Sequence, residues 1–189
     1  MSNKPEFLLW CDIETTGLNP ETDAILEMAL VLTTPELEEI NRWHRVFQPS
    51  LDFSKISPEV KEMHEKNGLW NDVITKGENG TSGVLYWIGT HTYKGSTVSP
   101  SEYEYFDHFK NIYLAGSSVH FDRQFLKAKK GYFIDSLSHR IVDVSVVRTL
   151  LKMWGREDLM WPQNNTHRAM DDILDHIEEL KHYRKVLDL

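Results

Sequence analysis

An apolar strand that ends in two carboxylates constrains this chain more than any other feature of its sequence. Residues 7–13 (FLLWCDI) have the composition of a buried β-strand, yet they include Asp12 and run directly into Glu14 before a Thr-Thr-Gly turn. Side chains two positions apart in a strand point to the same face, so these two carboxylates project together, about 5–7 Å apart. A divalent cation with oxygen ligands, such as Mg²⁺, would relieve their repulsion, whereas a solvated pair at a strand end is the simpler alternative.

The hydrophobic pattern predicts an α/β fold in a single domain that covers residues 1–189. Turn-forming residues between the first two apolar segments favour an antiparallel pair, and Ser57 followed by Pro58 marks the start of a helix. Strands are expected at 7–13, 24–33, 42–49, 112–119 and 140–147. Helices are expected at 57–68, from 99, from about 122, from about 145, and over roughly the last 20 residues. The Gly-, Ser- and Thr-rich segment 76–98 has a β-prone centre and is predicted to form a β-hairpin-like insertion.

Composition and charge limit the classes of protein to consider. The 189 residues, 40% apolar and 26% charged, are typical of a globular protein with one substantial core. The polar start MSNKPEF and the lack of an apolar run of about 20 residues argue against a signal peptide and a membrane span. The single cysteine, Cys11, fits a reducing compartment, so we expect a cytoplasmic protein. The net charge of −8 argues against a general nucleic-acid coat protein, and such a chain would need cations to act on phosphates.

Three further segments carry residues that could join the first two carboxylates. The segment GSSVHFDRQF places Asp122 at the opening of a helix, where the helix dipole also favours an acid without any function. The segment THRAMDDI places His167, Asp171 and Asp172 where the last helix begins. A solvated histidine is the alternative there. Asp143, in RIVDVS, is another acid within a strand, and a structural role would also explain it.

Taken together, these segments resemble the DEDDh 3′→5′ exonuclease superfamily. DIETTGL resembles its first motif, GSSVHFDRQFL its second and HRAMDDI its third, H-x-A-x-x-D, and the resemblance spans residues 7–182. Within the superfamily, GSSVHFDRQFL, RIVDVSVVRTL and the segment that begins with THRAMDDI are most similar to oligoribonucleases, which cleave very short oligoribonucleotides. The resemblance implies an RNase H-like fold with a mixed five-stranded sheet flanked by helices.

The same resemblance implies a role for each motif residue. The residues that would hold two Mg²⁺ ions, with Mn²⁺ as an alternative, are Asp12, Glu14, Asp122 and Asp172. His167 would be the general base, since an imidazole ordinarily titrates near neutral pH. The motif selects Asp172 over Asp171, and helix periodicity agrees, because Asp172 lies beside the apolar stripe of the last helix. The implied activity is 3′→5′ hydrolysis of short single-stranded RNA, or of DNA, to nucleoside 5′-monophosphates. The resemblance also implies a homodimer, and no association with a membrane is expected.

A substrate-binding set follows from the resemblance: Thr15, Gly17, Leu18, Ser117, Ser118 and His139. Three positions depart from oligoribonucleases. Ser117 replaces an asparagine, His139 replaces a tyrosine that reaches the neighbouring active site across the dimer interface, and Glu59 replaces an aromatic residue that packs on a base. We therefore expect hydrolysis of oligonucleotides of several residues without a sharp preference for dinucleotides.

Two other functions stay open at this point. DIETTGL is closer to proofreading-type exonucleases, because Thr15 stands where oligoribonucleases usually have methionine. A DNA-directed exonuclease of proofreading or repair type is therefore one alternative. The other is a nucleotide-binding or interaction module that has lost catalysis, and the presence of all five catalytic residues argues against it.

Overall fold

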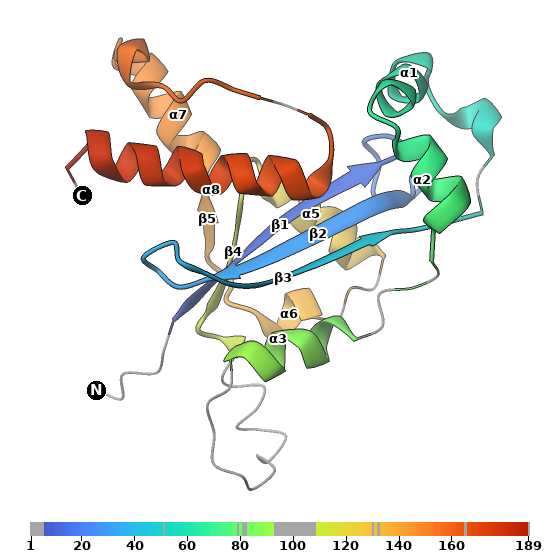
Figure 1. The fold of residues 1–189 in the computed structure, drawn as a ribbon, viewed down its shortest axis with the longest axis horizontal. Coiled ribbons are helices and arrows are strands. Elements are labelled where there is room, and N and C mark those ends of the chain that lie inside the picture. The colour runs from blue at the N-terminus through green and yellow to red at the C-terminus, as the bar shows by residue number, and fades with distance from the viewer. Residues whose placement is uncertain are drawn as a thin grey trace, which may run out of the picture.

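The computed structural model contains one five-stranded sheet with helices on both of its faces (Figure 1). It describes residues 6–50, 52–78, 80, 83–92, 109–129, 131, 133–164 and 166–188. The strands are β1 (Phe7–Thr15), β2 (Ile25–Thr33), β3 (Glu39–Val46), β4 (Ile112–Gly116) and β5 (Ile141–Asp143). The α-helices are α1 (Pro58–Lys66), α2 (Leu69–Lys76), α3 (Val84–Thr92), α5 (His120–Ala128), α6 (Phe133–Ser136), α7 (Val144–Met153) and α8 (Ala169–Val186). None of the helices in these ranges is both long and apolar enough to cross a membrane.

The sheet is mixed, with the strand order β3-β2-β1-β4-β5. β1 pairs antiparallel with β2, and β2 pairs antiparallel with β3. β1 is parallel to β4, and β4 is parallel to β5. The predicted mixed five-stranded sheet is therefore confirmed. Because β1, β4 and β5 run in the same direction, their carboxyl ends lie at one edge of the sheet, where the predicted acids follow them.

The two faces of the sheet pack against different helices. In β1, odd-numbered residues such as Leu9 join the core that includes α3, α5 and α6. Even-numbered residues such as Trp10 pack with Ile173 of α8. Figure 1 shows α8 crossing one face of the sheet while α3 and α6 lie beyond the other. Since Asp12 and Glu14 continue the even-numbered series, they project toward the α8 face.

Capping contacts explain where two of the predicted helices begin. Ser57 Oγ accepts a hydrogen bond from the Val60 backbone N at 3.3 Å, and α1 begins at Pro58 as expected. The strand predicted at 140–147 is shorter than expected, because Asp143 ends β5 and begins α7. Its Oδ1 accepts from the Ser145 backbone N at 3.0 Å. A capping carboxylate thus stops the strand that the apolar run alone would extend.

The predicted β-hairpin-like insertion at 76–98 is wrong over the described residues, because Val84–Thr92 form the helix α3. Val84 and Ile88 lie four positions apart on one side of this helix and are buried in the core. Nε2 of His91 also lies 2.6 Å from Nδ2 of Asn41 in β3. Packing of a helical apolar face onto the sheet outweighs the β propensity of the individual residues. Residues 93–98 of the insertion, and the start of the helix expected from 99, lie outside the described residues.

Candidate active site

Asp12 and Glu14 lie near the carboxyl end of β1, which neighbouring elements enclose. Glu14 is 7% exposed and Asp12 is half-buried. Glu14 pairs across the β1–β2 register with Glu27, a second buried acid. Behind them, Nε2 of the buried His64 lies 3.9 Å from Glu14 Oε2 and 3.1 Å from the carbonyl oxygen of Thr15. The strand end therefore concentrates carboxylates in an interior position.

Asp122 joins these acids from the segment that follows β4. It lies in the first turn of α5 and is 4% exposed. Its Oδ1 accepts a hydrogen bond from the Ile13 backbone N at 3.0 Å, between residues 109 positions apart. This contact holds the start of α5 against the strand segment that carries Asp12 and Glu14.

The start of α8 brings a histidine and a further acid to the same place. Asp172 lies in the first turn of α8, and its Oδ1 accepts from the backbone N and Oγ1 of Thr166 at 3.0 and 2.9 Å. His167 is exposed and has a φ of 53°, in the left-handed region. Among the described residues, Glu14, His167 and Asp172 each offer one potential metal ligand atom, and these atoms lie within 4.8 Å of one another. The fold thus joins residues from both ends of the chain.

The carboxylates of this cluster raise one another's affinity for protons. Burial, and then the charges of Asp122 and Glu14, raise the pKa of Asp12 well above its usual range. Burial, and then the charge of Asp172, raise the pKa of Glu14 to about 8. Burial also raises the pKa of Asp122 to about 8, although backbone hydrogen bonds oppose this change. A bound cation would relieve such a cluster, and carboxylate oxygens are the ligands that Mg²⁺ and Mn²⁺ prefer.

Three of the predicted substrate-binding residues follow directly after the acids of β1. Thr15 is buried, and its Oγ1 donates to the carbonyl oxygen of Gly17 at 2.6 Å. A Cβ at Gly17 would lie 2.5 Å from Asp23 Oδ2, so any other residue would displace that side chain. Leu18 is 82% exposed. The turn therefore presents a large apolar side chain to solvent four positions after the buried Glu14.

Two more predicted substrate-binding residues, Ser117 and Ser118, follow β4. Ser118 has a φ of 54°, and its backbone N donates to Asp143 Oδ1 at 2.9 Å. Ser117 Oγ accepts from Arg148 Nη2 at 3.3 Å. Both serines are therefore tied to the β5–α7 segment at the edge of the sheet where the acids of β1 lie.

His139 and Glu59 both lie at the surface. His139 is exposed in the segment before β5, and its carbonyl oxygen accepts from Arg123 Nη1 at 3.0 Å. Glu59 is exposed in the first turn of α1. Both side chains are therefore exposed to solvent, and the Glu59 carboxylate accepts hydrogen bonds from its own backbone N–H and from Ser57.

Three residues at the site were not predicted from the sequence: Glu27, His64 and Arg168. Glu27 is 1% exposed, and the Arg168 guanidinium donates to its carboxylate at 3.0–3.2 Å. One signal was available, because Glu27 interrupts the apolar segment 24–33 and a buried acid requires a partner. The identity of that partner could not be read from the segment itself.

Comparison with known protein families and sequences shows to which family the chain belongs. The family model described as Exonuclease (RNase_T) matches residues 9–180. The chain is 33% identical to a probable oligoribonuclease of Dictyostelium discoideum, over 97% of this chain and 92% of that protein. It is 31% identical to an oligoribonuclease of Shewanella putrefaciens, over 94% of this chain and 93% of that protein. The mitochondrial oligoribonuclease of Mus musculus is 33% identical, over 94% of this chain and 71% of that protein.

Solved structures share the fold at low sequence identity. The zinc-bound complex of Escherichia coli exonuclease I with single-stranded DNA has a TM-score of 0.66 and 18% identity over 96% of this chain. Exonuclease I of Methylocaldum szegediense has a TM-score of 0.65 and 16% identity over 95% of this chain. The chain spans 41% and 40% of these two proteins, and the likeness confirms the predicted RNase H-like exonuclease fold. Because the family model covers most of its length, the chain belongs to the exonuclease (RNase_T) family and is a DEDDh exonuclease similar to oligoribonuclease.

Proposed function

We propose that this protein removes nucleotides from the 3′ end of short single-stranded oligoribonucleotides and releases nucleoside 5′-monophosphates. The observation that carries the proposal is the meeting of Glu14, His167 and Asp172, whose potential ligand atoms lie within 4.8 Å of one another. The family and the relatives named oligoribonuclease support the same class of reaction. The preference for RNA rests on those relatives and is part of the proposal.

The proposed metal site consists of Asp12, Glu14, Asp122 and Asp172. Two Mg²⁺ ions, with Mn²⁺ as the alternative, would supply the positive charge that acidifies the attacking water and stabilises charge developing on the phosphate. The chain keeps the carboxylates in place: Ile13 holds Asp122, and Thr166 holds Asp172. Because four acids converge, a phosphate can approach them only together with cations.

His167 is proposed as the general base that takes the proton from the attacking water. Its side chain is exposed, so substrate can reach it, and a ring nitrogen lies close to Glu14 and Asp172. The same position would allow the ring to bind a metal directly. The two roles differ in their kinetic signature, because loss of a base lowers kcat while loss of a ligand lowers metal affinity.

Substrate recognition is proposed for the residues around the cluster: Thr15, Gly17, Leu18, Ser117, Ser118 and His139. Leu18 would contact a base. His139 would reach the active site of a partner subunit in a homodimer, and light scattering can test whether the protein is a dimer. Because Glu59 offers no ring for stacking, we expect no sharp preference for dinucleotides. His139→Tyr should raise kcat/KM on dinucleotides selectively. A preference of the unaltered protein for dinucleotides of about tenfold (~1.4 kcal/mol) over 5- to 7-mers would contradict this expectation.

A panel of 5′-labelled RNA and DNA, from dinucleotides to about 20-mers, tests the proposal in Mg²⁺, in Mn²⁺ and in EDTA. We expect RNA to be shortened stepwise from its 3′ end with release of 5′-monophosphates, and Asp12→Asn to be inactive. Faster degradation of DNA at every length would favour the repair-type alternative. Full activity in EDTA would contradict the metal site, and binding without cleavage in every arm would favour a non-catalytic module.

A further inference from the structure

We infer that the buried ion pair between Glu27 and Arg168 positions His167 for proton transfer. Both are positioning residues, because neither belongs to the proposed metal or substrate-binding sets and both act through the backbone next to the histidine. The inference rests on the proposed role of His167 and adds the structural device that holds the base in place.

The backbone of His167 needs support from its surroundings. Its φ of 53° lies in a region that L side chains rarely adopt. The side chain is exposed, so burial of the ring does not hold this conformation. Support comes from both flanks: Asn67 Nδ2 donates to the carbonyl oxygen of His167, and the preceding Thr166 donates to Asp172.

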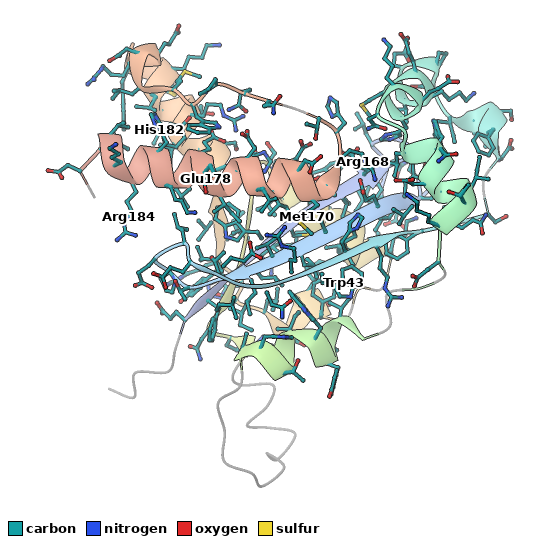
Figure 2. All side chains as sticks on the ribbon, in the orientation of Figure 1. Trp43, Arg168, Met170, Glu178, His182 and Arg184 are labelled. Carbon is teal, nitrogen blue, oxygen red and sulfur yellow. The ribbon has the colours of Figure 1, made fainter. Side chains whose placement is uncertain are left out.

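Arg168 anchors the same turn to three other segments. Its Nε and Nη2 donate to the carboxylate of Glu27 in β2 at 3.0–3.2 Å, and Nη2 also donates to Asp72 Oδ2 of α2 at 2.9 Å. Its Nη1 donates to the carbonyl oxygen of Asn67, after α1, at 3.3 Å. Figure 2 shows Arg168 at the beginning of α8, on the side toward α2. A planar guanidinium with partners on three segments leaves the adjoining residue little freedom.

Glu27 is the centre of this arrangement. Its Oε2 accepts from the Ala169 backbone N at 3.0 Å, so a carboxylate from β2 caps α8, whose own N-cap residue provides no side-chain cap. His44 Nε2 lies 2.7 Å from Oε1. Burial alone would raise the pKa of Glu27, but hydrogen bonds from His44, Arg168 and Ala169 lower it, so the carboxylate stays ionised. The pair therefore fixes both the first turn of α8 and the residue just before it.

A second buried ion pair, between Arg148 of α7 and Glu179 of α8, offers a matched control. The side chains of Arg148 and Glu179 are 24% and 0% exposed, against 24% and 1% for Arg168 and Glu27. In both pairs the guanidinium donates to both carboxylate oxygens, and each pair joins α8 or its N-cap residue to another element. Glu179 lies further along α8 and also accepts from Gln163 and Tyr183, whereas Glu27 contacts the two residues that directly follow His167. Since Arg148 also donates to Ser117 of the proposed substrate-binding set, the control compares kcat and stability, not KM. If burial of an ion pair were all that mattered, loss of either glutamate would have the same consequence.

The test compares Glu27→Gln with Glu179→Gln. For each variant, kcat, KM and the half-saturating Mg²⁺ concentration are measured with an oligoribonucleotide substrate, and the thermal midpoint of the protein is measured separately. Glu27→Gln is expected to lower kcat about tenfold, with KM and the Mg²⁺ dependence within about twofold. When His167→Ala is already present, adding Glu27→Gln should change kcat by less than about twofold, because its effect passes through the missing ring. Glu179→Gln should lower the thermal midpoint by about as much as Glu27→Gln does, but it should leave kcat within about twofold.

Three results would overturn the inference. Glu27→Gln could lower kcat equally with and without His167, or Glu179→Gln could lower kcat as much as Glu27→Gln does. Glu27→Gln could also change only the Mg²⁺ dependence, which would indicate an effect through Glu14. If Glu27→Gln fails to fold, Asp72→Asn removes a partner of Arg168 near the surface, and kcat should fall about threefold in the same His167-dependent way. Unchanged kcat in that variant would contradict the inference. Full kcat in His167→Ala alone would instead contradict the proposed function.

Discussion

The two regions that form the candidate site differ in how they hold their side chains. In the first, β1 and α5 carry Glu14 and Asp122, which are 7% and 4% exposed and belong to regular elements. In the second, the turn before α8 carries His167, which is exposed and left-handed. The buried carboxylates thus belong to a strand and a helix, whereas the proposed general base lies in a turn that ion pairs and hydrogen bonds hold in place. The acids therefore depend on regular elements for their position, whereas His167 depends on the contacts of the residues around it.

The largest effect is expected from the first region. Asp12→Asn should abolish turnover, because it removes a proposed metal ligand. It should also stabilise the metal-free protein, because one of several mutually repelling carboxylates is neutralised. Each kcal/mol gained would raise the thermal midpoint by about 2–4 °C for a chain of this size. Kinetics in Mg²⁺ and thermal melts in EDTA measure the two effects. Asp171→Asn, a control at an exposed acid, should change neither, and an active Asp12→Asn protein would contradict the assignment.

The next largest effect is expected from the second region. His167→Ala should lower kcat by roughly 10²–10⁴, with an unchanged half-saturating Mg²⁺ concentration, as loss of a general base does. His167→Gly should lose the same activity but be more stable than His167→Ala by about 1 kcal/mol, because glycine adopts a φ of 53° without strain. Steady-state kinetics and denaturant unfolding measure these outcomes. A collapse of metal affinity would show that the ring is a ligand and would remove the contrast between the two regions.

The regions should also differ in how they couple stability to pH. The folded state raises the pKa of Glu14 and of Asp122 to about 8, so it binds their protons more tightly than the unfolded chain does. Their stabilising contribution is therefore complete at low pH and is lost as the pH rises toward 8. Burial lowers the pKa of His64 and of His176, and this makes stability rise with pH up to about 6.5, so the acids are tested above that range. The thermal midpoint in EDTA should fall between about pH 7 and pH 8.5. The fall should be smaller in Asp12→Asn, unchanged in His167→Ala and reduced by saturating Mg²⁺. A midpoint that rises over this range would contradict the buried cluster.

The smallest effect is expected where the first region meets solvent. Leu18→Ala should raise KM about three- to tenfold with kcat unchanged, because the side chain is proposed to contact substrate and not the reacting atoms. The thermal midpoint should stay the same, since Leu18 is 82% exposed. Ile74→Ala is a matched control at another exposed apolar residue, 66% exposed on α2, and should change neither KM nor stability. A fall in kcat alone would place Leu18 in the chemistry of the site.

Local patterns in the sequence predicted much of this structure. The apolar runs at 7–13 and 24–33, the Ser57–Pro58 helix start and the apolar spacing of the last helix correspond to β1, β2, α1 and α8. Alternation along β1 also predicted that Asp12 and Glu14 share a face. These features depend on side-chain period and on caps, which residues close in sequence specify. The helix α3 was missed for the opposite reason, because its conformation depends on packing against the sheet.

The contacts that complete the site depend on residues far apart in the chain. Asp122 meets Ile13 across 109 positions, and Arg168 meets Glu27 across 141. No local pattern selects the partner of a buried charge, because the partner is set by how the sheet and α8 pack together. Local sequence patterns specified which acids stand at the ends of strands and helices. Which of these acids meet, and which ion pair lies beside the histidine, depends on how distant elements pack, because a buried charge without a partner costs too much free energy.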